Sequence, residues 1–360
     1  MDDSASINDI RLQSDFKGYS FSKYKKTDVK KELLKNIANE KLEFACNWAA
    51  ELVCAGHFAD LWEVILVFMS RNIHVANPKL PIYLNKRFQT FREIVGGGYI
   101  GQEIRLRNNI SVRRLFAEVM CILCFSKKSH SFEPVKINKS EDFDLTQLSR
   151  KLKAPNVTYA NLVTRDDDMR ELHLVINELI YSIRSGNSLI ACYWVEWIVD
   201  FESVCKSNRE QVLCARREFV PVDPRYQKEP IWIIWDIILT LSKEESELHS
   251  SIVDNLFQLF CLKYTPGVVK KRRFLIYFGI SVLTNHWDRD QPLVANTQDV
   301  AAVLDKCNLV YKQIKKHEES PNTDYLFANS AQSNIDKTAR RLEILRNYDS
   351  NGSSLPVVEK

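Results

Sequence analysis

Two cysteines are the first residues of this chain whose spacing could serve chemistry, because Cys121 and Cys124 form a C-x-x-C pair with His130 close behind. A structural zinc site needs four ligands, which turns usually present, whereas these cysteines stand within the apolar helical run FAEVMCILCF. Another pair, Cys205 and Cys214, does not have the spacing of a zinc knuckle. We therefore interpret Cys121 and Cys124 as core residues and expect no metal site.

Motifs that hold nucleotides or perform catalysis are missing from the sequence. Neither G-x-x-x-x-G-K-[ST] nor G-x-G-x-x-G occurs, and the glycines at 96–98 are followed by Tyr-Ile-Gly, which favours a flexible joint over a phosphate cradle. H-E-x-x-H and G-x-S-x-G are absent as well. The acidic run at 166–168 suits the positive end of a helix dipole better than a cation site. We therefore expect a non-enzymatic protein with no cofactor and no catalytic residues.

Two clusters of basic residues are the remaining candidates for a binding function. They comprise Arg105, Arg107, Arg113 and Arg114 in RLRNNISVRR, and Lys270, Lys271, Arg272 and Arg273 in VVKKRRF. Each cluster leads into an apolar helical run, where positive charge opposes the helix dipole and a purely structural role is less expected. Such clusters could instead bind the phosphates of a nucleic acid. The alternative is that they are solvated helix ends with local ion pairs.

The elements that must position these residues are predicted to be helices. The 360 residues are 45% apolar and include only 10 Gly and 11 Pro, fewer chain breakers than sheet-rich folds need. A formal net charge of +4 permits a nucleic-acid partner without requiring one. The nine cysteines stand mostly on apolar helical faces, which is typical of reduced, buried thiols rather than of a disulfide framework.

No segment of the sequence indicates export or membrane insertion. The N-terminal residues MDDSASINDI lack the basic and apolar regions of a secretory signal. The densest apolar run, IWIIWDIILTL, is roughly half the length that spans a bilayer, and Asp236 interrupts it. We therefore expect a soluble intracellular protein with no membrane partner.

The sequence contains Ala-Cys-x-Trp twice, in FACNWAAELV and IACYWVEWIV. Aligned without gaps, these segments place Trp48 on Trp194. Two further blocks match in the same order: DLWEVILVF with IIWDIILTL, which places Trp62 on Trp235, and VRRLFAEVMCIL with KRRFLIYFGISVL. Chance does not readily produce three matched blocks in one order. The pattern predicts an all-α fold with a tandem duplication of a unit of about five helices, in which the four tryptophans are buried.

The matched blocks also set the predicted domain boundaries. The second copy contains a longer insertion between its second and third helices, which includes FVPVDPRYQKEP. Beyond it, Thr297–Lys316 and Ser330–Tyr348 have the pattern of two amphipathic helices. The predicted parts are a flexible N-terminal arm (1–26), helical repeat 1 (27–127), a linker (128–167), helical repeat 2 (168–290), C-terminal helices (291–348) and a flexible tail (349–360).

Residues 28–84 resemble the helical C-terminal collar region of clamp-loader-like AAA+ ATPases of the replication-associated recombination protein A type. Two motifs of that family are matched, the first by Ala45, Trp48, Ala49 and Leu52, the second by Phe68, Ser70, Ile73, Ala76 and Pro78. The acidic pair that the family has after the serine is replaced by Arg71-Asn72, and the ATPase module is absent. The resemblance therefore implies at most a helical collar used for oligomerisation or partner binding.

A second resemblance covers more of the chain. The segments NWAAELVCAGHFADLWEVIL, NPKLPIYLNKRF and NNISVRRLFAEVMCIL are similar to segments of conserved, uncharacterised helical proteins of large nucleocytoplasmic DNA viruses. This resemblance implies a viral protein of the host cytoplasm or nucleus, or of the virion, and brings no catalytic residues with it.

These observations favour a helical scaffold or adaptor that acts through protein–protein interaction, with viral proteins or with itself, in replication, transcription or assembly. The alternative is a nucleic-acid-binding replication accessory that uses the basic clusters to contact DNA and has a collar-like helical domain without ATPase activity.

Overall fold

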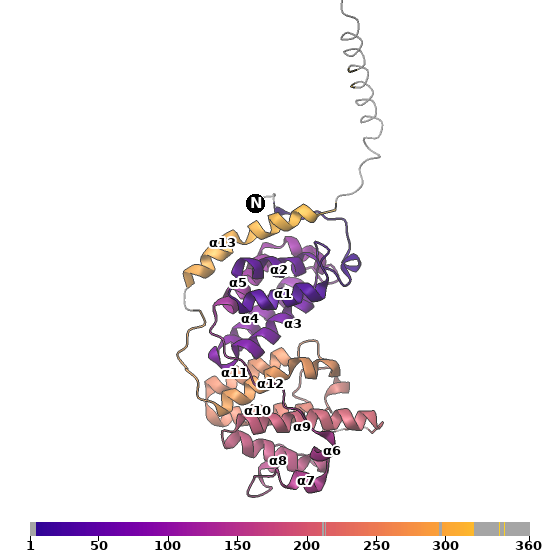
Figure 1. The fold of residues 1–360 in the computed structure, drawn as a ribbon, viewed down its shortest axis with the longest axis vertical. Helices are drawn as coiled ribbons and strands as arrows, with labels where there is room; N and C mark the ends of the chain where they lie inside the picture. Colours follow the sequence, from indigo (N-terminus) through magenta and orange to yellow (C-terminus); the bar gives the residue numbers. More distant parts are fainter. Residues whose placement is uncertain are drawn as a thin grey trace, which may run out of the picture. The chain divides into compact units, whose positions relative to one another are not determined.

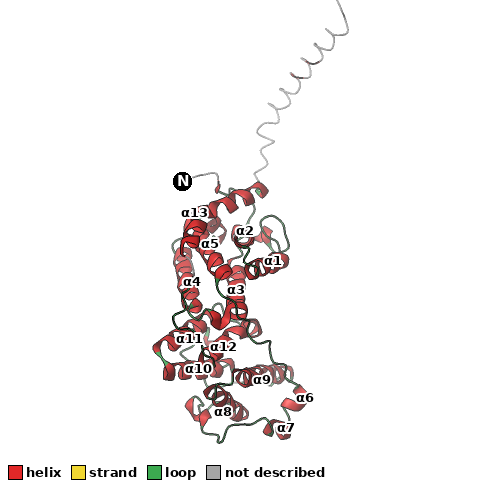
Figure 2. Cartoon of the chain, turned by 60° about the vertical axis from the view of Figure 1, so that its left-hand side comes forward, coloured by secondary structure: helices red, strands yellow, loops and turns green. Residues whose placement is uncertain are grey.

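The computed structural model describes residues 5–210, 212, 214–294, 297–319, 338 and 342. The all-α prediction is confirmed, because the described residues form helices and no β-strand, apart from one isolated bridge between Tyr19 and Lys25 (Figure 2). None of the helices among these residues has the length and hydropathy that crossing a bilayer requires.

Two sets of five helices follow one another at the places that the sequence predicts (Figure 1). The first set consists of α1 (Lys26–Ala38), α2 (Leu42–Cys54), α3 (Phe58–Phe68), α4 (Leu80–Gly96) and α5 (Ile110–Phe125). The second consists of α8 (Arg170–Arg184), α9 (Ser188–Ser207), α10 (Ile231–Glu245), α11 (Glu247–Phe260) and α12 (Val269–Thr284). The longer connection between α9 and α10 is the predicted insertion.

The two sets also share their packing pattern. In each set the first helix packs on the second, and the second helix packs on the fifth. Local sequence explains the boundaries: the side chain of Asn109 accepts two backbone N–H bonds at the start of α5, and Asn187 accepts one at the start of α9. Gly56 and Gly186, with φ of 74° and 70°, supply the left-handed conformation that follows α2 and α8. The recurrence of five helices with matching contacts supports the predicted duplication.

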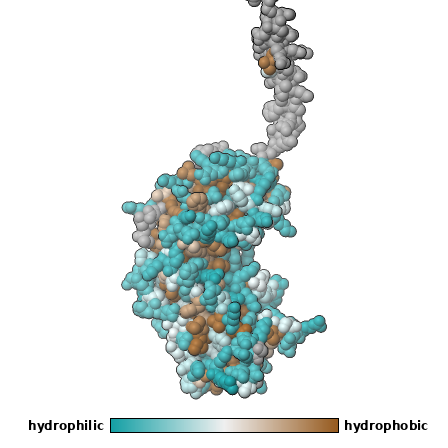
Figure 3. All heavy atoms as spheres, viewed as in Figure 1, coloured by the Kyte–Doolittle hydropathy of each residue, from teal (hydrophilic) through white to brown (hydrophobic). Residues whose placement is uncertain are grey.

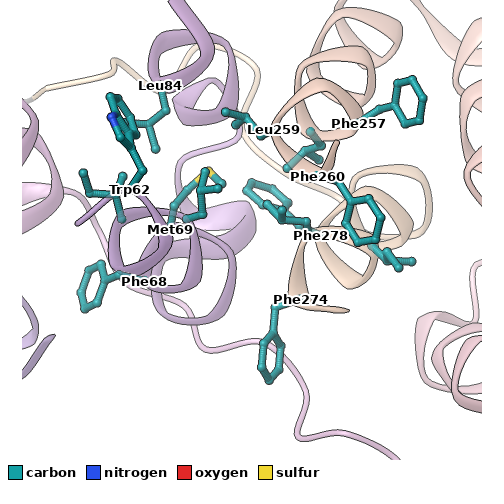
Figure 4. Close-up of a cluster of buried hydrophobic side chains, with 14 of the residues drawn as sticks. Trp62, Phe68, Met69, Leu84, Phe257, Leu259, Phe260, Phe274 and Phe278 are labelled. Atoms are coloured by element: carbon teal, nitrogen blue, oxygen red, sulfur yellow. The ribbon is translucent and has the colours of Figure 1, made fainter. Parts of the chain in front are cut away.

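The core is continuous across the junction between the two sets. Here α4 packs on α11, while α3 and the π-helical turn Met69–Ile73 pack on α12. Figure 4 shows Met69 from the first set beside Phe278 and Leu259 from the second, and all three side chains are fully buried. Burying apolar surface of this kind is the main favourable contribution to folding. The junction therefore joins both sets into one compact unit.

The prediction that four tryptophans are buried is correct for three of them. Trp194 and Trp235 are fully buried and Trp62 is 4% exposed. Trp48 is the exception, because it is only partly buried and lies edge-on to the exposed ring of Tyr24 at a centroid distance of 5.4 Å. Trp48 therefore lies on the side of α2 that faces Tyr24 in the N-terminal segment.

Within the predicted flexible arm, residues 5–7 and 12–26 pack against the first set. Phe16 and Phe21 are buried, and Asn108 exchanges two hydrogen bonds with the backbone of Ile7, at 2.9 and 2.8 Å. Ser22 donates from its backbone N–H and its hydroxyl to the carboxylate of Glu51 on α2. Two of the scattered aromatic residues of this segment, Phe16 and Phe21, are thus core residues, whereas Tyr19 and Tyr24 are exposed.

The predicted linker also packs on a helical set. It contains the short helices α6 (Lys139–Asp142) and α7 (Leu145–Ser149). The buried carboxylate of Glu178 on α8 accepts the backbone N–H groups of residues 153 and 154 at 2.8 and 2.9 Å, and Trp197 Nε1 on α9 donates to the carbonyl of Asp142 at 2.8 Å. The segment before each set therefore covers part of the second helix of that set.

The first predicted C-terminal helix is present as α13 (Thr297–Ile314), which packs on α2 and α5 of the first set. Tyr311 and Ile314 are its most deeply buried residues, at 4% and 2% exposure. Of the second predicted helix, Ser330–Tyr348, only residues 338 and 342 are described, both as helical. The predicted tail, 349–360, lies outside the described residues.

A small second unit comprises Asn8–Arg11 and the chain from Glu318 onward. Within it, the backbone N–H of Glu319 donates to Asp9 Oδ2 at 2.9 Å, and Arg11 forms an ion pair with the same carboxylate at 2.5 Å.

Candidate binding cleft and the predicted basic clusters

The first basic cluster is divided between buried and exposed arginines. Arg113 is 5% exposed and donates to the carbonyls of Arg107 and Ala5 and to the side chains of Asn108 and Asn308, at 2.6 to 3.1 Å. Its guanidinium carbon lies 4.1 Å from the ring centroid of Tyr311 on α13. The nitrogens of its guanidinium therefore donate their hydrogen bonds inside the protein.

The other arginines of this cluster have separate environments. Arg107 is 7% exposed, with its guanidinium 6.0 Å from the ring centroid of Phe21. Arg105 and Arg114 are exposed, and Arg114 reaches Asp305 only at 3.8 Å. Because Asp305 is itself largely exposed, this ion pair contributes little to stability.

The second cluster lies at the start of α12, but one of its arginines donates hydrogen bonds to backbone carbonyls at the end of α11. Arg272 is 7% exposed and donates from Nη1 to the carbonyls of Phe260 and Leu262, at 2.9 and 2.5 Å. Its Nη2 also contacts Glu63 Oε2 at 2.7 Å. A cation is favourable beside the free carbonyls at a helix C-terminus, which explains why positive charge is found at this position.

The neighbouring cations pair with α9. Arg273 Nη1 lies 2.8 Å from Glu196 Oε2, and the same buried carboxylate accepts the hydroxyl of Tyr277 at 2.6 Å. Burial raises the pKa of Glu196 despite these partners. Lys270 contacts Asp200 at 3.2 Å, whereas Lys271 is exposed and belongs to no ion pair among the described residues.

These environments limit which residues of the two clusters could contact phosphates. Arg107, Arg113 and Arg272 are buried, so their guanidiniums are not available to phosphates. Four residues of the clusters are exposed: Arg105, Arg114, Lys270 and Lys271. Lys270 pairs with Asp200, so Arg105, Arg114 and Lys271 are the better candidates, and a nucleic-acid contact through them stays a prediction.

Sequence reasoning did not identify the site that the junction creates, an open cleft of about 710 Å³. Its walls are α3 and α4 of the first set and residues 261–263 with Arg272 of the second, and the turn after α4 contributes Ile100. The volume lies within the range of about 300–1,000 Å³ that is usual for ligand sites. The helices of this cleft are far apart in sequence, so no local motif indicates it.

Four aromatic rings of the first set line one side of the cleft. Trp62 lies edge-on to Phe88 at a centroid distance of 5.1 Å, and Phe58 lies 5.3 Å from Phe91. Such contacts fix the rings in place, because aromatic pairs at these distances are mutually attractive. At the rim, Ile100 is 76% exposed, the highest value among the large apolar residues that the structure describes. Figure 3 shows brown apolar patches among the mostly teal surface of one face.

The polar residues of the cleft are mostly charged. The ion pair between Arg272 and Glu63 closes one wall. Arg92 and Lys263 are exposed at the cleft and belong to no ion pair among the described residues. Burial raises the pKa of the Cys261 thiol, which keeps it protonated and weakly nucleophilic. Among the residues described, no group of three His, Cys, Asp or Glu side chains could hold a metal ion. The aromatic rings of the cleft offer contact area to apolar groups.

The two cysteines of the C-x-x-C pair are buried in α5, as the sequence predicts. Burial raises the pKa of Cys124 to about 12. The predicted helix-terminal role of the acidic run is incomplete, because Asp168 is buried and accepts the guanidinium of Arg217 at 2.5 and 2.8 Å. Sequence reasoning did not identify this pair, since its members are 49 positions apart along the chain.

Comparison of the chain with protein-family models, with curated proteins and with solved structures gives no match. The resemblances to the clamp-loader collar and to helical proteins of large DNA viruses stay predictions.

Proposed function

We propose that this protein is a non-enzymatic helical adaptor that binds a segment of another protein in the cleft between its two five-helix sets. The observation that carries the proposal is an aromatic-lined cleft that remains open to solvent beside an apolar rim residue. Grooves of this kind bind a partner segment through a few apolar side chains placed in preformed pockets. The resemblance to viral proteins favours a role for this adaptor in the replication, transcription or assembly of a large DNA virus.

Peptide selection tests the proposal even though the partner is unidentified. Random peptides displayed on phage are selected on the wild-type protein, and the enriched peptides are synthesised and titrated by fluorescence anisotropy. Replacing Ile100 with Gln removes apolar contact area at the rim and should weaken binding about tenfold. Leu189→Gln is the matched control, because Leu189 is 54% exposed on α9 and does not line the cleft. If no peptide binds, or if both substitutions have the same effect, the proposal is wrong.

A second candidate is the nucleic-acid accessory, which the exposure of Arg105, Arg114 and Lys271 favours. The test is anisotropy with duplex, single-stranded and primed DNA, titrated with salt, for the wild type and a variant with these three residues changed to Glu. Micromolar binding that falls steeply with salt and disappears in the variant would support this candidate. Absence of binding at physiological salt would exclude it.

A further inference from the structure

The cations of the cleft have unequal surroundings. Arg272 donates to two backbone carbonyls, and Glu63 at 2.7 Å neutralises its charge, so Arg272 is paired within the protein. Arg92, on α4, donates from Nη1 to the side-chain oxygen of Gln89 at 3.3 Å, a neutral partner. Lys263, in the turn after α11, is exposed. Neither Arg92 nor Lys263 contacts a carboxylate among the described residues.

The carboxylates of the cleft do not balance these two charges. The lining contains three basic residues and two acidic ones, Glu63 and Glu103. Glu63 is engaged by Arg272, and Glu103 accepts the backbone N–H of Gly101 at 3.3 Å. An apolar cleft with unpaired cations on both of its sides attracts negative charge, since electrostatic complementarity guides partner choice.

The backbone at Lys263 adds a separate observation. Its φ is +44°, in the region that glycine adopts without strain and that costs other residues free energy. Glycine would therefore be the more stable choice at this turn. The protein thus has a lysine at the cleft although this residue strains the local backbone.

We infer that the segment bound in the cleft is an acidic peptide, with a bulky apolar side chain against the aromatic rings and Asp or Glu residues in contact with Arg92 and Lys263. This inference rests on the proposed function and adds the chemistry of the partner. Arg92 belongs to the first helical set and Lys263 to the second, so the acidic peptide bridges the two sets across their junction. Exposed ion pairs are weak individually, and two of them that the peptide partly desolvates should change affinity about tenfold.

The test uses the peptides enriched by selection on the wild-type protein, together with versions in which Asp and Glu are changed to Asn and Gln. We expect the enriched peptides to combine aromatic or large aliphatic residues with acidic ones. The neutralised peptides should bind about tenfold more weakly, and the difference should shrink as the salt concentration rises.

The protein variants are Arg92→Gln with Lys263→Gly, and Lys271→Gln as the matched control on an exposed lysine outside the cleft. Lys263→Gly removes the cation while relieving backbone strain, so this substitution should not destabilise the fold, and circular dichroism checks that the double variant is folded. The double variant should lose the preference for acidic peptides and retain the contribution of the apolar anchor. The control should behave as wild type.

Charge reversal supplies the decisive comparison. Peptides in which the acidic residues are changed to Lys should bind better to the variant Arg92→Glu with Lys263→Glu than to wild type. If the enriched peptides are apolar but carry no acidic residues, or if neutralisation leaves affinity unchanged, the inference fails while the adaptor proposal stands. If no peptide is enriched, the adaptor proposal itself fails.

Discussion

The buried guanidinium of Arg217 offers the sharpest test of how the second helical set is held together. Arg217 is fully buried in the connection between α9 and α10. It donates to both oxygens of Asp168, to Asp236 Oδ2 at 3.3 Å, and to the carbonyls of Val163 and Ala215 at 3.0 and 2.9 Å. One side chain thereby ties the α9–α10 connection to the entrance of α8. The perturbation is Arg217→Met, which keeps a long apolar stem and removes the donors.

The magnitude follows from what the substitution leaves behind. The Asp168 side chain is fully buried and keeps only the backbone N–H bonds from Arg165 and Ala215, at 2.8 and 2.9 Å. Breaking a buried ion pair by removing one partner costs about 3–5 kcal/mol, because the other charge stays desolvated. Asp168→Asn should cost less, since Asp236 remains as a partner for Arg217. The double variant removes both charges and should be more stable than Arg217→Met alone.

The assay is guanidinium unfolding followed by circular dichroism at 222 nm, together with thermal unfolding. A loss of 3–5 kcal/mol corresponds to a decrease in Tm of roughly 6–20 °C, at about 2–4 °C per kcal/mol for a domain of this order of size. The reasoning would be refuted if Arg217→Met cost less than about 1 kcal/mol, or if the double variant were less stable than the single one.

Three further predictions concern other parts of the fold. Burial lowers the pKa of His74 from 6.5 to about 4, so the folded state binds fewer protons than the unfolded state between these pH values. When the pH is lowered from 7.5 to 4, the wild type should therefore lose about 3 kcal/mol more stability than the variant His74→Gly. Urea unfolding at both pH values measures this difference. In α12, a Cβ on Gly279 would meet Ile238 Cγ2 at 3.2 Å, so Gly279→Val should lower the free energy of unfolding by about 1–3 kcal/mol in the same assay. An unchanged unfolding midpoint would show that α10 and α12 are less tightly packed. Tyr311→Ala should lower stability by about 3–5 kcal/mol because it empties the contact of α13 with Arg113, whereas Tyr311→Phe should cost under about 1.5 kcal/mol; equal losses would contradict this reasoning.

Local patterns in the sequence predict most of the helical framework. The stripes of apolar residues and the recurrence of Ala-Cys-x-Trp indicate where most helices of the two sets lie, because helix formation depends on contacts three and four residues apart. The same patterns place Trp62, Trp194 and Trp235 in the core. They fail for Trp48, because periodicity indicates which residues share a helical face but not how well another segment covers that face.

The environment of the basic residues at the candidate site could not be predicted from local sequence patterns. Basic residues in RLRNNISVRR and VVKKRRF look alike in the sequence, yet Arg113 and Arg272 are buried while Arg105 and Lys271 are exposed. The difference comes from partners distant in the chain, such as Glu63 for Arg272. A charge can be buried only where such partners satisfy it, so its role is decided when the helices assemble.

The sequence by itself determined the helical class, the approximate bounds of both five-helix sets and the apolar character of their cores. The tertiary structure alone decided that residues 12–26 pack on the first set, that α13 returns to the first set, and that α3, α4, α11 and α12 meet around an open cleft. The physical reason is that a helix's own sequence specifies which of its faces is apolar, whereas the choice of partner for that face depends on the shape and charge of residues far away along the chain.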